Sequence, residues 1–360
     1  MHPLDDFTAI RRLDRSDMLM KAAALPDQCL QGWRLGRSWK VPPRLRGLDQ
    51  LLVLGVGGSA IGGDLIQGFL AEGSSKPVLV QRNYTLPAWV NRRTLALVVS
   101  YSGNTEETLT AAFQAKRRGA QILAVTSGGK LARWAVRNRF PLVRIPGGWP
   151  PRGAMGYGAF VPLGLMARLG WFGRKDPFPV RQAAQEASRY IVKKLAPEVP
   201  ESRNPAKQLA GQLQGGLPLL YGASGGFEGV VYRWRTQLEE NAKTLAYHHL
   251  FPEATHNEIS GWGEPRACMK QIRVLLMTDP VVHPKIRQRM DFTARVARQE
   301  GARIIPVEVP GRSRLARMLK LISLGDFVSV YLGLLYRVDP TPVVRVEALK
   351  RFMKGKPVRP

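Results

Sequence analysis

The sequence predicts an α/β protein of two domains, each a mainly parallel β-sheet flanked by helices in a three-layer αβα arrangement. The chain has 360 residues, more than one hydrophobic core usually organises. Short apolar runs alternate with stretches of helical periodicity, which is typical of βαβ units. Stretches rich in glycine and proline, at 146–158 and 197–205, interrupt this alternation, and it resumes after them.

The first half is predicted to contain five strands. An N-terminal segment, residues 1–45, precedes them and has leucine and methionine at helical spacing. The helix predicted at 106–118 places Leu109, Ala112 and Phe113 on one face. The apolar runs that fit buried parallel strands are 51–55, 78–80, 95–100, 121–126 and 142–145.

The second half is predicted to repeat this pattern after a helical connection that includes a helix at 181–195. The predicted strands are 218–222, 274–278 and 304–309, and the predicted helices are 238–247 and 285–299. The predicted units are an N-terminal helical segment (1–45), a first domain (46–150), a helical connection (151–200), a second domain (201–350) and a basic C-terminal tail (351–360).

The net charge of +27 is the unusual bulk property of the chain. Such a charge raises the question of nucleic-acid binding. The basic residues are spread along the whole sequence, however, and neither a zinc-finger nor an RRM signature is present. We interpret the charge as a solvated surface that attracts phosphorylated metabolites, and we do not expect specific nucleic-acid binding.

The sequence favours a cytoplasmic protein that does not enter a membrane. No apolar run reaches the roughly 20 residues that a bilayer-spanning helix needs. The first residues mix acidic and basic side chains and lack the apolar region of a signal peptide. The two cysteines, Cys29 and Cys268, lie far apart, so neither a disulfide framework nor a cysteine-based zinc site is expected.

A glycine-rich turn, residues 55–64, follows the first predicted strand directly. Glycine lets the main chain approach a ligand closely, and the helix that follows offers free N–H groups. The turn partly resembles a dinucleotide fingerprint, but Arg82 stands where the acidic residue is expected. Taken alone, a tight strand–helix turn explains these glycines as well as a ligand does.

A second turn, residues 100–108, carries three hydroxyl groups between a strand and a helix, on Ser100, Ser102 and Thr105. Each can donate to a phosphate oxygen, and a helix N-terminus favours an anion. One such residue would be explained as a helix cap. Three of them, with Ser59 on the neighbouring glycine-rich turn, predict a cradle for a phosphate monoester.

Residues 100–108, Ser-Tyr-Ser-Gly-Asn-Thr-Glu-Glu-Thr, resemble the phosphate-binding signature of sugar-isomerase (SIS) domains. The order of motifs along residues 45–350 resembles the bifunctional phosphoglucose/phosphomannose isomerases of the phosphoglucose isomerase superfamily. This resemblance implies two flavodoxin-like SIS domains. It also implies that Ser100, Ser102 and Thr105 hold the sugar 6-phosphate, and that a frame around the sugar is formed by Gly57, Gly58 and Ser59.

Residues 151–157, Pro-Arg-Gly-Ala-Met-Gly-Tyr, resemble a further segment of these isomerases. The resemblance places Arg152 near C1 and C2 of the substrate. A guanidinium there would stabilise the negative charge of a developing enediolate. Without the neighbouring pattern, Arg152 would be one more surface arginine in a basic protein.

Residues 235–243 are predicted to start a helix and carry two adjacent acids, Glu239 and Glu240. Acids in a first turn usually match the helix dipole. The Glu-Asn-Ala-Lys stretch resembles the family segment that holds the general base, which implies Glu240. Alignment on the Glu-x-Asn of ordinary phosphoglucose isomerases selects Glu239 instead, and both remain open here.

Residues 256–258, His-Asn-Glu, resemble the family motif whose histidine opens the sugar ring. In the family this histidine reaches the site of the neighbouring subunit, so His256 implies a homodimer. A pKa near neutrality suits proton exchange with a ring oxygen. Metal binding by His248, His249 and His256 is not expected, because the HExxH spacing is missing.

Residues 339–350 resemble the C-terminal family segment that supplies a lysine for ring opening. The resemblance implies this role for Lys350, and it implies that Thr341 makes room for a water molecule and for either C2 epimer. Lys350 also stands among other basic residues, so a plain surface lysine is the alternative.

Together these residues imply an aldose–ketose isomerase that interconverts glucose 6-phosphate, mannose 6-phosphate or both with fructose 6-phosphate through a cis-enediol. No metal or redox cofactor is expected, because carbonyl and hydroxyl exchange within one molecule. The alternative is a non-catalytic SIS-domain sensor of sugar phosphates. Such regulators usually carry a helix-turn-helix, and the first ~50 residues lack a clear recognition helix.

Overall fold

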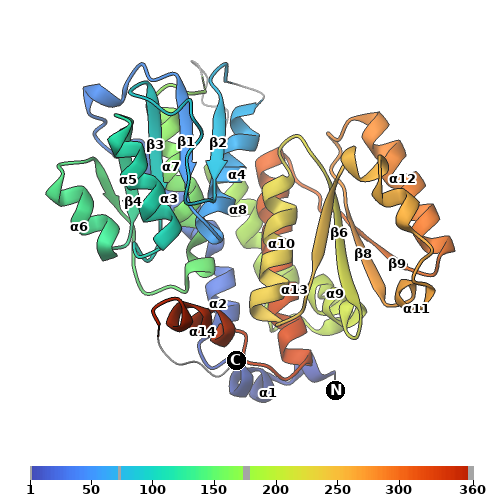
Figure 1. Cartoon of the computed structure of the whole chain (residues 1–360). Helices are drawn as coiled ribbons and strands as arrows, with labels where there is room; N and C mark the ends of the chain where they lie inside the picture. The colour runs from blue at the N-terminus through green and yellow to red at the C-terminus, as the bar shows by residue number, and fades with distance from the viewer. Residues whose placement is uncertain (1, 72–73, 173–178, 356–360) are drawn as a thin grey trace.

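Two parallel sheets lie side by side in the computed structural model, which describes residues 2–71, 74–172 and 179–355 (Figure 1). The first sheet has the strand order β2-β1-β3-β4-β5 and the second the order β7-β6-β8-β9. The strands of the first sheet are β1 (Gln50–Leu54), β2 (Val78–Gln81), β3 (Thr94–Val99), β4 (Gln121–Thr126) and β5 (Leu142–Arg144). Those of the second are β6 (Leu217–Ala223), β7 (Tyr247–Phe251), β8 (Ile272–Met277) and β9 (Arg303–Val307).

The strands of the first sheet are apolar on both faces because helices cover both. Leu52 and Val98 pack with α5 (Glu106–Arg117) and α6 (Gly129–Arg137) on one face. Leu51, Val53 and Leu97 contribute to a core on the other face. The helices on that side are α4 (Gly58–Ala71), α7 (Met155–Arg168) and α3 (Leu25–Ser38). The predicted parallel α/β arrangement is confirmed.

The second sheet is built in the same way. Val274 and Leu276 pack with α12 (Pro284–Gln299) on its outer face. Leu220 and Leu275 face inward and join the core that the first sheet also contributes to. The inner helices are α9 (Pro205–Leu213), α10 (Glu228–Asn241) and α13 (Arg314–Leu335). One core therefore joins the two halves.

Helices outside the two sheets complete this core and the surface. The short N-terminal helices are α1 (Phe7–Leu13) and α2 (Met18–Ala23). The remaining helices are α8 (Val180–Tyr190), α11 (Arg266–Met269) and α14 (Val344–Phe352). Of the predicted basic tail, residues 351–352 end α14, and residues 356–360 lie outside the described residues.

Helix α13 is the one described helix that is long and apolar enough to cross a membrane. Within its most apolar window 94% of residues are buried inside the protein, so α13 is a core helix. The sequence showed no uninterrupted run of that length because Lys320 and Asp326 divide it. Asp326 is tolerated in the core because it pairs with Arg233.

Two predicted helix positions in the second half are wrong. Helix α10 begins at Glu228 instead of near residue 235, and it ends at Asn241. It ends there because Lys243 adopts a left-handed conformation with φ 57°, and the Thr244 amide then donates to Leu238 O. The predicted helix at 238–247 therefore gives way to a turn and to strand β7, whose polar composition concealed it.

Candidate active site

The glycine-rich turn and the hydroxyl turn lie next to each other at the carboxyl edge of the first sheet. They follow β1 and β3, which pair directly. From β1 the strand order runs to β2 on one side and to β3 on the other, so the two turns flank the point where the order reverses. Open α/β sheets bind their ligands at this point. The expected adjacency of the two turns is confirmed, although the sequence did not reveal the strand order that produces it.

The hydroxyl turn does not use its side chains to cap the helix that follows. Thr105 is the N-cap residue of α5, yet its side chain makes no capping hydrogen bond. Its Oγ1 instead lies 3.0 Å from Ser100 Oγ. Ser102 is exposed on the same turn. The first N–H groups of α5 therefore keep their capacity to bind an anion, which is the property that a phosphate cradle needs.

Gly103 makes this tight turn possible. Its φ is 65°, and a Cβ at this position would lie 1.9 Å from Gly128 O. A side chain would therefore push the turn away from the neighbouring loop after β4. The conformation of Ser102 and Asn104 on either side depends on this close approach.

The glycine-rich turn lacks the features of a dinucleotide site. Arg82, at the end of β2, forms an ion pair with Asp64 of α4. In a dinucleotide fold an acidic residue at that place would bind a ribose. The arginine instead pairs with Asp64, the last residue of the stretch 55–64, so the dinucleotide interpretation loses support.

Arg152 belongs to the short helix η3 (Pro151–Ala154) and is buried, with 3% of its surface exposed. Its Nε donates to Asn241 Oδ1 at 2.7 Å, and its Nη1 donates to Glu240 Oε2 at 3.2 Å. Its Nη2 donates to the carbonyl oxygens of Pro340 and Thr341 at 2.8 and 2.9 Å. The alternative of a surface arginine is therefore wrong. Burial lowers the pKa of Arg152, and the nearby Glu240 acts against that shift.

Both turns of the first half contact the segment that carries Arg152. A Cβ on Gly58 would lie 3.4 Å from Pro151 O, which is ordinary contact. The Trp149 amide donates to Tyr101 Oη at 2.9 Å. The two turns and Arg152 are therefore joined through residues 149–152.

The two adjacent acids occupy the last turn of α10, where the helix dipole disfavours negative charge. A favourable interaction with the helix dipole therefore does not explain these two acids. Glu240 pairs with Arg152, and its side chain is 35% exposed. Glu239 lies 3.9 Å from Arg235 on its own helix, and burial raises its pKa. Of the two, Glu240 is the one that Arg152 contacts.

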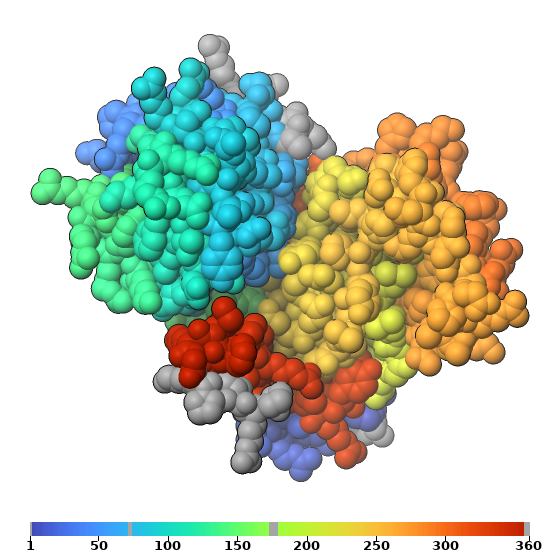
Figure 2. Space-filling view, viewed as in Figure 1, coloured from blue at the N-terminus to red at the C-terminus, as the bar shows by residue number. Residues whose placement is uncertain are grey.

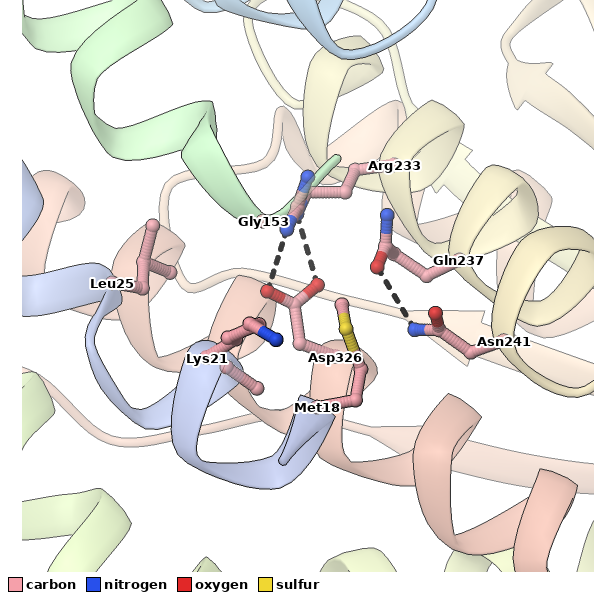
Figure 3. Close-up of a pocket in the computed structure, with 9 residues that line it drawn as sticks. Met18, Lys21, Leu25, Gly153, Arg233, Gln237, Asn241 and Asp326 are labelled. Carbon is pink, nitrogen blue, oxygen red and sulfur yellow. Dashed lines mark hydrogen bonds and ion pairs between the residues drawn. The ribbon is translucent and has the colours of Figure 1, made fainter. Parts of the chain in front are cut away.

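A buried network lies next to Arg152, and Figure 3 shows its members Arg233, Asp326, Gln237 and Asn241. Arg233 donates through Nε and Nη2 to Asp326 at 2.9 and 2.7 Å, and its Nη2 also donates to Arg152 O at 3.2 Å. Asn241 donates to Gln237 Oε1 and to Ser329 Oγ. Arg233, Gln237, Asn241 and Asp326 border a cavity of about 10 Å³, room for about one water molecule. Burial raises the pKa of Asp326, and Arg233 opposes that shift.

The segment 339–343 closes the other side of Arg152. Its turn is fixed by the Thr341 amide, which donates to Asp339 Oδ1 at 2.9 Å. The Thr341 hydroxyl is buried and has no partner among the described residues. Lys243 donates from Nζ to Pro340 O at 3.0 Å and to Pro342 O at 2.7 Å. This lysine belongs to the Glu-Asn-Ala-Lys stretch, but the sequence predicted no role for it.

Two of the predicted site residues, His256 and Lys350, lie outside this cluster in the folded chain. His256 is exposed at the end of η6 (Glu253–Thr255), just after the carboxyl end of β7. Lys350 is exposed on α14, a helix without buried residues. Near His256, Glu258 contacts both Tyr221 and His249. These contacts fix the loop, and they are a feature that the sequence did not predict.

In residues 2–71, 74–172 and 179–355, no three His, Cys, Asp or Glu side chains gather closely enough to hold a metal ion. The groups that meet around Arg152 are a guanidinium, a carboxylate, an amide and main-chain carbonyls. They can hold an oxyanion and move a proton.

Comparisons with known proteins agree with this geometry. Residues 44–136 match the SIS domain, and residues 202–353 match the bacterial phospho-glucose isomerase C-terminal SIS domain. A bifunctional phosphoglucose/phosphomannose isomerase from Caldicellulosiruptor bescii is 40% identical over 91% of this chain and 96% of its own. One from Aquifex aeolicus is 33% identical over 84% of this chain and 90% of its own.

Solved structures show the same fold. A glucose-6-phosphate isomerase like protein from Thermus thermophilus superposes with a TM-score of 0.61 and 21% identity, covering 95% of this chain and 98% of its own. With two matched SIS domains and relatives of this identity, the chain belongs to the bifunctional phosphoglucose/phosphomannose isomerase family.

Proposed function

We propose that this protein is an aldose–ketose isomerase that interconverts glucose 6-phosphate and mannose 6-phosphate with fructose 6-phosphate. The observation that carries the proposal is the contact between Arg152 and Glu240 beside the glycine-rich turn. It brings a buried cation and an accessible carboxylate to one place, next to a turn suited to an anion. The relatives named above carry the corresponding activities in their names.

The substrate phosphate binds between the two turns of the first sheet. Ser59, Ser100, Ser102 and Thr105 donate their hydroxyls, and Gly57 and Gly58 allow the sugar to approach the main chain. The uncapped first turn of α5 supports this assignment. The overall positive charge of the protein raises the local concentration of such anions.

Glu240 is the general base. It removes the C2 proton of the open-chain aldose and returns a proton to C1, while the C1 carbonyl becomes a hydroxyl and the C2 hydroxyl becomes a carbonyl. Arg152 stabilises the negative charge of the enediolate between these steps. The intermediate has no stereocentre at C2, so both aldose epimers lead to the same ketose. Glu239 stays the alternative base, although its contact with Arg235 supports Glu240.

Ring opening needs acid–base groups that do not belong to this cluster. His256 lies at the carboxyl edge of the second sheet, where α10 begins, and Glu240 lies one helix length away, roughly 18 Å at 1.5 Å per residue. This separation supports a homodimer in which His256 serves the site of the neighbouring subunit. Lys350 assists from α14, and Thr341 contacts the substrate through its unpartnered hydroxyl.

The reaction needs no electron carrier, because oxidation and reduction occur on neighbouring carbons of one sugar. We infer that the protein works in the cytoplasm. The residues fall into an N-terminal helical segment to about 45, a first SIS domain to about 150, a connection to about 200 and a second SIS domain to about 350. The matched ranges support these boundaries.

A coupled assay tests the proposal. Fructose 6-phosphate formation is followed from glucose 6-phosphate and from mannose 6-phosphate with the purified wild-type protein. We expect turnover of both aldoses. If the protein binds both sugars in calorimetry but turns over neither, the isomerase proposal is contradicted and the sensor is supported.

A further inference from the structure

Lys243 is a residue with an unusual backbone. It follows the end of α10 directly and has φ 57°, the left-handed conformation that glycine most often adopts at this place. A side chain at such a position strains the backbone. A lysine nevertheless stands at this strained position, so its side chain needs an explanation.

The contacts of that side chain supply one. Nζ donates to Pro340 O at 3.0 Å and to Pro342 O at 2.7 Å, and it also contacts Glu240 O. Neither proline has an N–H group, so this segment cannot be fixed through main-chain donors at these two residues. Other elements therefore hold these two prolines through their carbonyl oxygens.

The same segment supports the reaction groups. Pro340 O accepts from Arg152 as well as from Lys243, and Thr341 O accepts from Arg152. The segment leads directly into α14, which carries Lys350. Figure 2 shows α14 at the junction between the two halves of the molecule. A shift of this turn would therefore move three groups of the proposed mechanism together.

We propose that Lys243 is a positioning residue, which fixes the 339–343 turn so that Arg152, Thr341 and Lys350 keep their places around the substrate. This role rests on the isomerase function proposed above. Lys243 acts through the turn and not on the reacting atoms. The charged and titratable groups that face it are Arg152, Asp339 and Glu240.

The electrostatics agree with a desolvated ammonium group. Partial burial of the ammonium group, together with the nearby charge of Arg152, lowers the pKa of Lys243 to about 8. Lys243 as a whole residue is exposed, and its ammonium group contacts the carbonyl oxygens of the turn. A lysine that simply projected into solvent would show no such shift.

The variant Lys243→Gly separates positioning from folding. Glycine relieves the left-handed backbone, so the urea midpoint is expected to stay equal or rise. The loss of the side chain is expected to lower kcat roughly 10- to 100-fold, because small displacements of reacting groups have effects of that size. KM is expected to change little, because the phosphate cradle belongs to other elements.

Two further variants complete the design. Lys243→Arg keeps a charged donor and is expected to recover most of the lost kcat. Lys193→Gly changes an exposed lysine on η4 (Ile191–Leu195) and is expected to leave kcat unchanged. Wild-type kcat in Lys243→Gly, or an equal loss in Lys243→Arg, would overturn the proposal.

Hydrogen exchange gives a readout that does not depend on activity. In Lys243→Gly the amides of residues 343–352 are expected to exchange faster than in the wild type, and in Lys193→Gly they are expected to exchange at the wild-type rate. Unchanged exchange in Lys243→Gly would overturn the positioning role. Faster exchange in a protein that turns over neither sugar would contradict the isomerase function and leave the contact with the turn intact.

Discussion

Arg152 Nη1 lies 3.2 Å from Glu240 Oε2, and this pair joins the two halves of the chain. Four acceptors hold the guanidinium in place, and Arg233 donates to the main-chain carbonyl of Arg152. The carboxylate keeps 35% of its side chain exposed. A fixed cation beside an accessible carboxylate suits a reaction in which a proton moves while negative charge develops nearby.

The first prediction concerns the two adjacent acids. Glu240→Gln removes the proposed base and keeps the shape of the side chain, so we expect kcat to fall about 10²- to 10⁴-fold. Glu239→Gln is the matched control, because it changes the same group one residue earlier. It is expected to keep kcat within about threefold of the wild type, since its partner is Arg235. Both are measured with the coupled assay, and the reverse order of effects would identify Glu239 as the base.

The second prediction concerns the geometry of Arg152. Lysine keeps the positive charge but cannot reach Asn241, Glu240 and the carbonyls of residues 340–341 together. We expect Arg152→Lys to lower kcat by about 10²- to 10³-fold, the effect of losing a group that stabilises an oxyanion. Steady-state kinetics measures this effect, and circular dichroism checks the fold. A variant with full kcat would show that charge alone suffices.

The third prediction concerns the phosphate cradle. Ser102 is exposed on its turn, so Ser102→Ala removes a hydroxyl without opening a core cavity. A hydrogen bond to a charged group contributes about 1.5–3 kcal/mol, so we expect KM for the sugar phosphate to rise by at least tenfold. Inhibition by inorganic phosphate should weaken in parallel. Ser38, an exposed serine at the end of α3, is the control outside the site. An unchanged KM in Ser102→Ala would place the phosphate elsewhere.

The sequence predicted the fold wherever burial determined the pattern. The strands β1, β3 and β4 are almost wholly buried, so their apolar runs were unmistakable. Strand β7 reads Tyr-His-His-Leu-Phe and is mostly only partly buried, so its composition did not indicate a strand. The end of α10 was missed for a different reason. It depends on the conformation of Lys243, which composition does not determine.

The resemblance implied that Arg152 and Glu240 share one site, but the residues themselves did not reveal how the fold brings them together. Hydroxyls and glycines after strands indicated the phosphate turns, because local chemistry is visible in a sequence. The meeting of Arg152 with Glu240 joins residues 88 apart, and it depends on the packing of two sheets against one core. The hydrogen bonds from Lys243 to Pro340 O and Pro342 O join residues 97 and 99 apart, and they depend on the same packing. Such contacts leave no local pattern.

The fourth prediction concerns stability and pH. Lys243 has a pKa of about 8 in the folded protein and 10.5 as its ordinary value, so the unfolded chain binds more protons between these two values. The free energy of unfolding therefore gains a contribution as pH rises from about 8 towards 10. The gain is small, because the side chain is partly exposed to solvent.

Comparison with Lys243→Gly isolates this contribution, because other groups titrate equally in both proteins. The urea midpoint of the wild type should rise relative to the variant between about pH 8 and pH 10. A difference that shrinks over this range would mean that the folded protein favours the charged lysine, contrary to the desolvation seen here.

The fifth prediction concerns the origin of His256. If His256 serves the neighbouring subunit, His256→Ala and Glu240→Gln chains damage different parts of two sites in a mixed dimer. One site of that dimer carries both changes, and the other carries neither. When the two inactive variants are mixed at random, about a quarter of wild-type activity should return. Half of the dimers are then mixed, and each mixed dimer has one intact site of two.

Co-expression of the two variants with different tags, followed by purification through both tags, isolates the mixed dimer and should raise the recovery to about half of wild-type activity. The double variant Glu240→Gln/His256→Ala, co-expressed with wild type, is the control. In that pair each site loses one group if the residues come from different chains, so the mixed dimer should be inactive. If both residues come from one chain, the result is reversed: the wild-type chain keeps its activity in the control, and the two single variants do not complement each other.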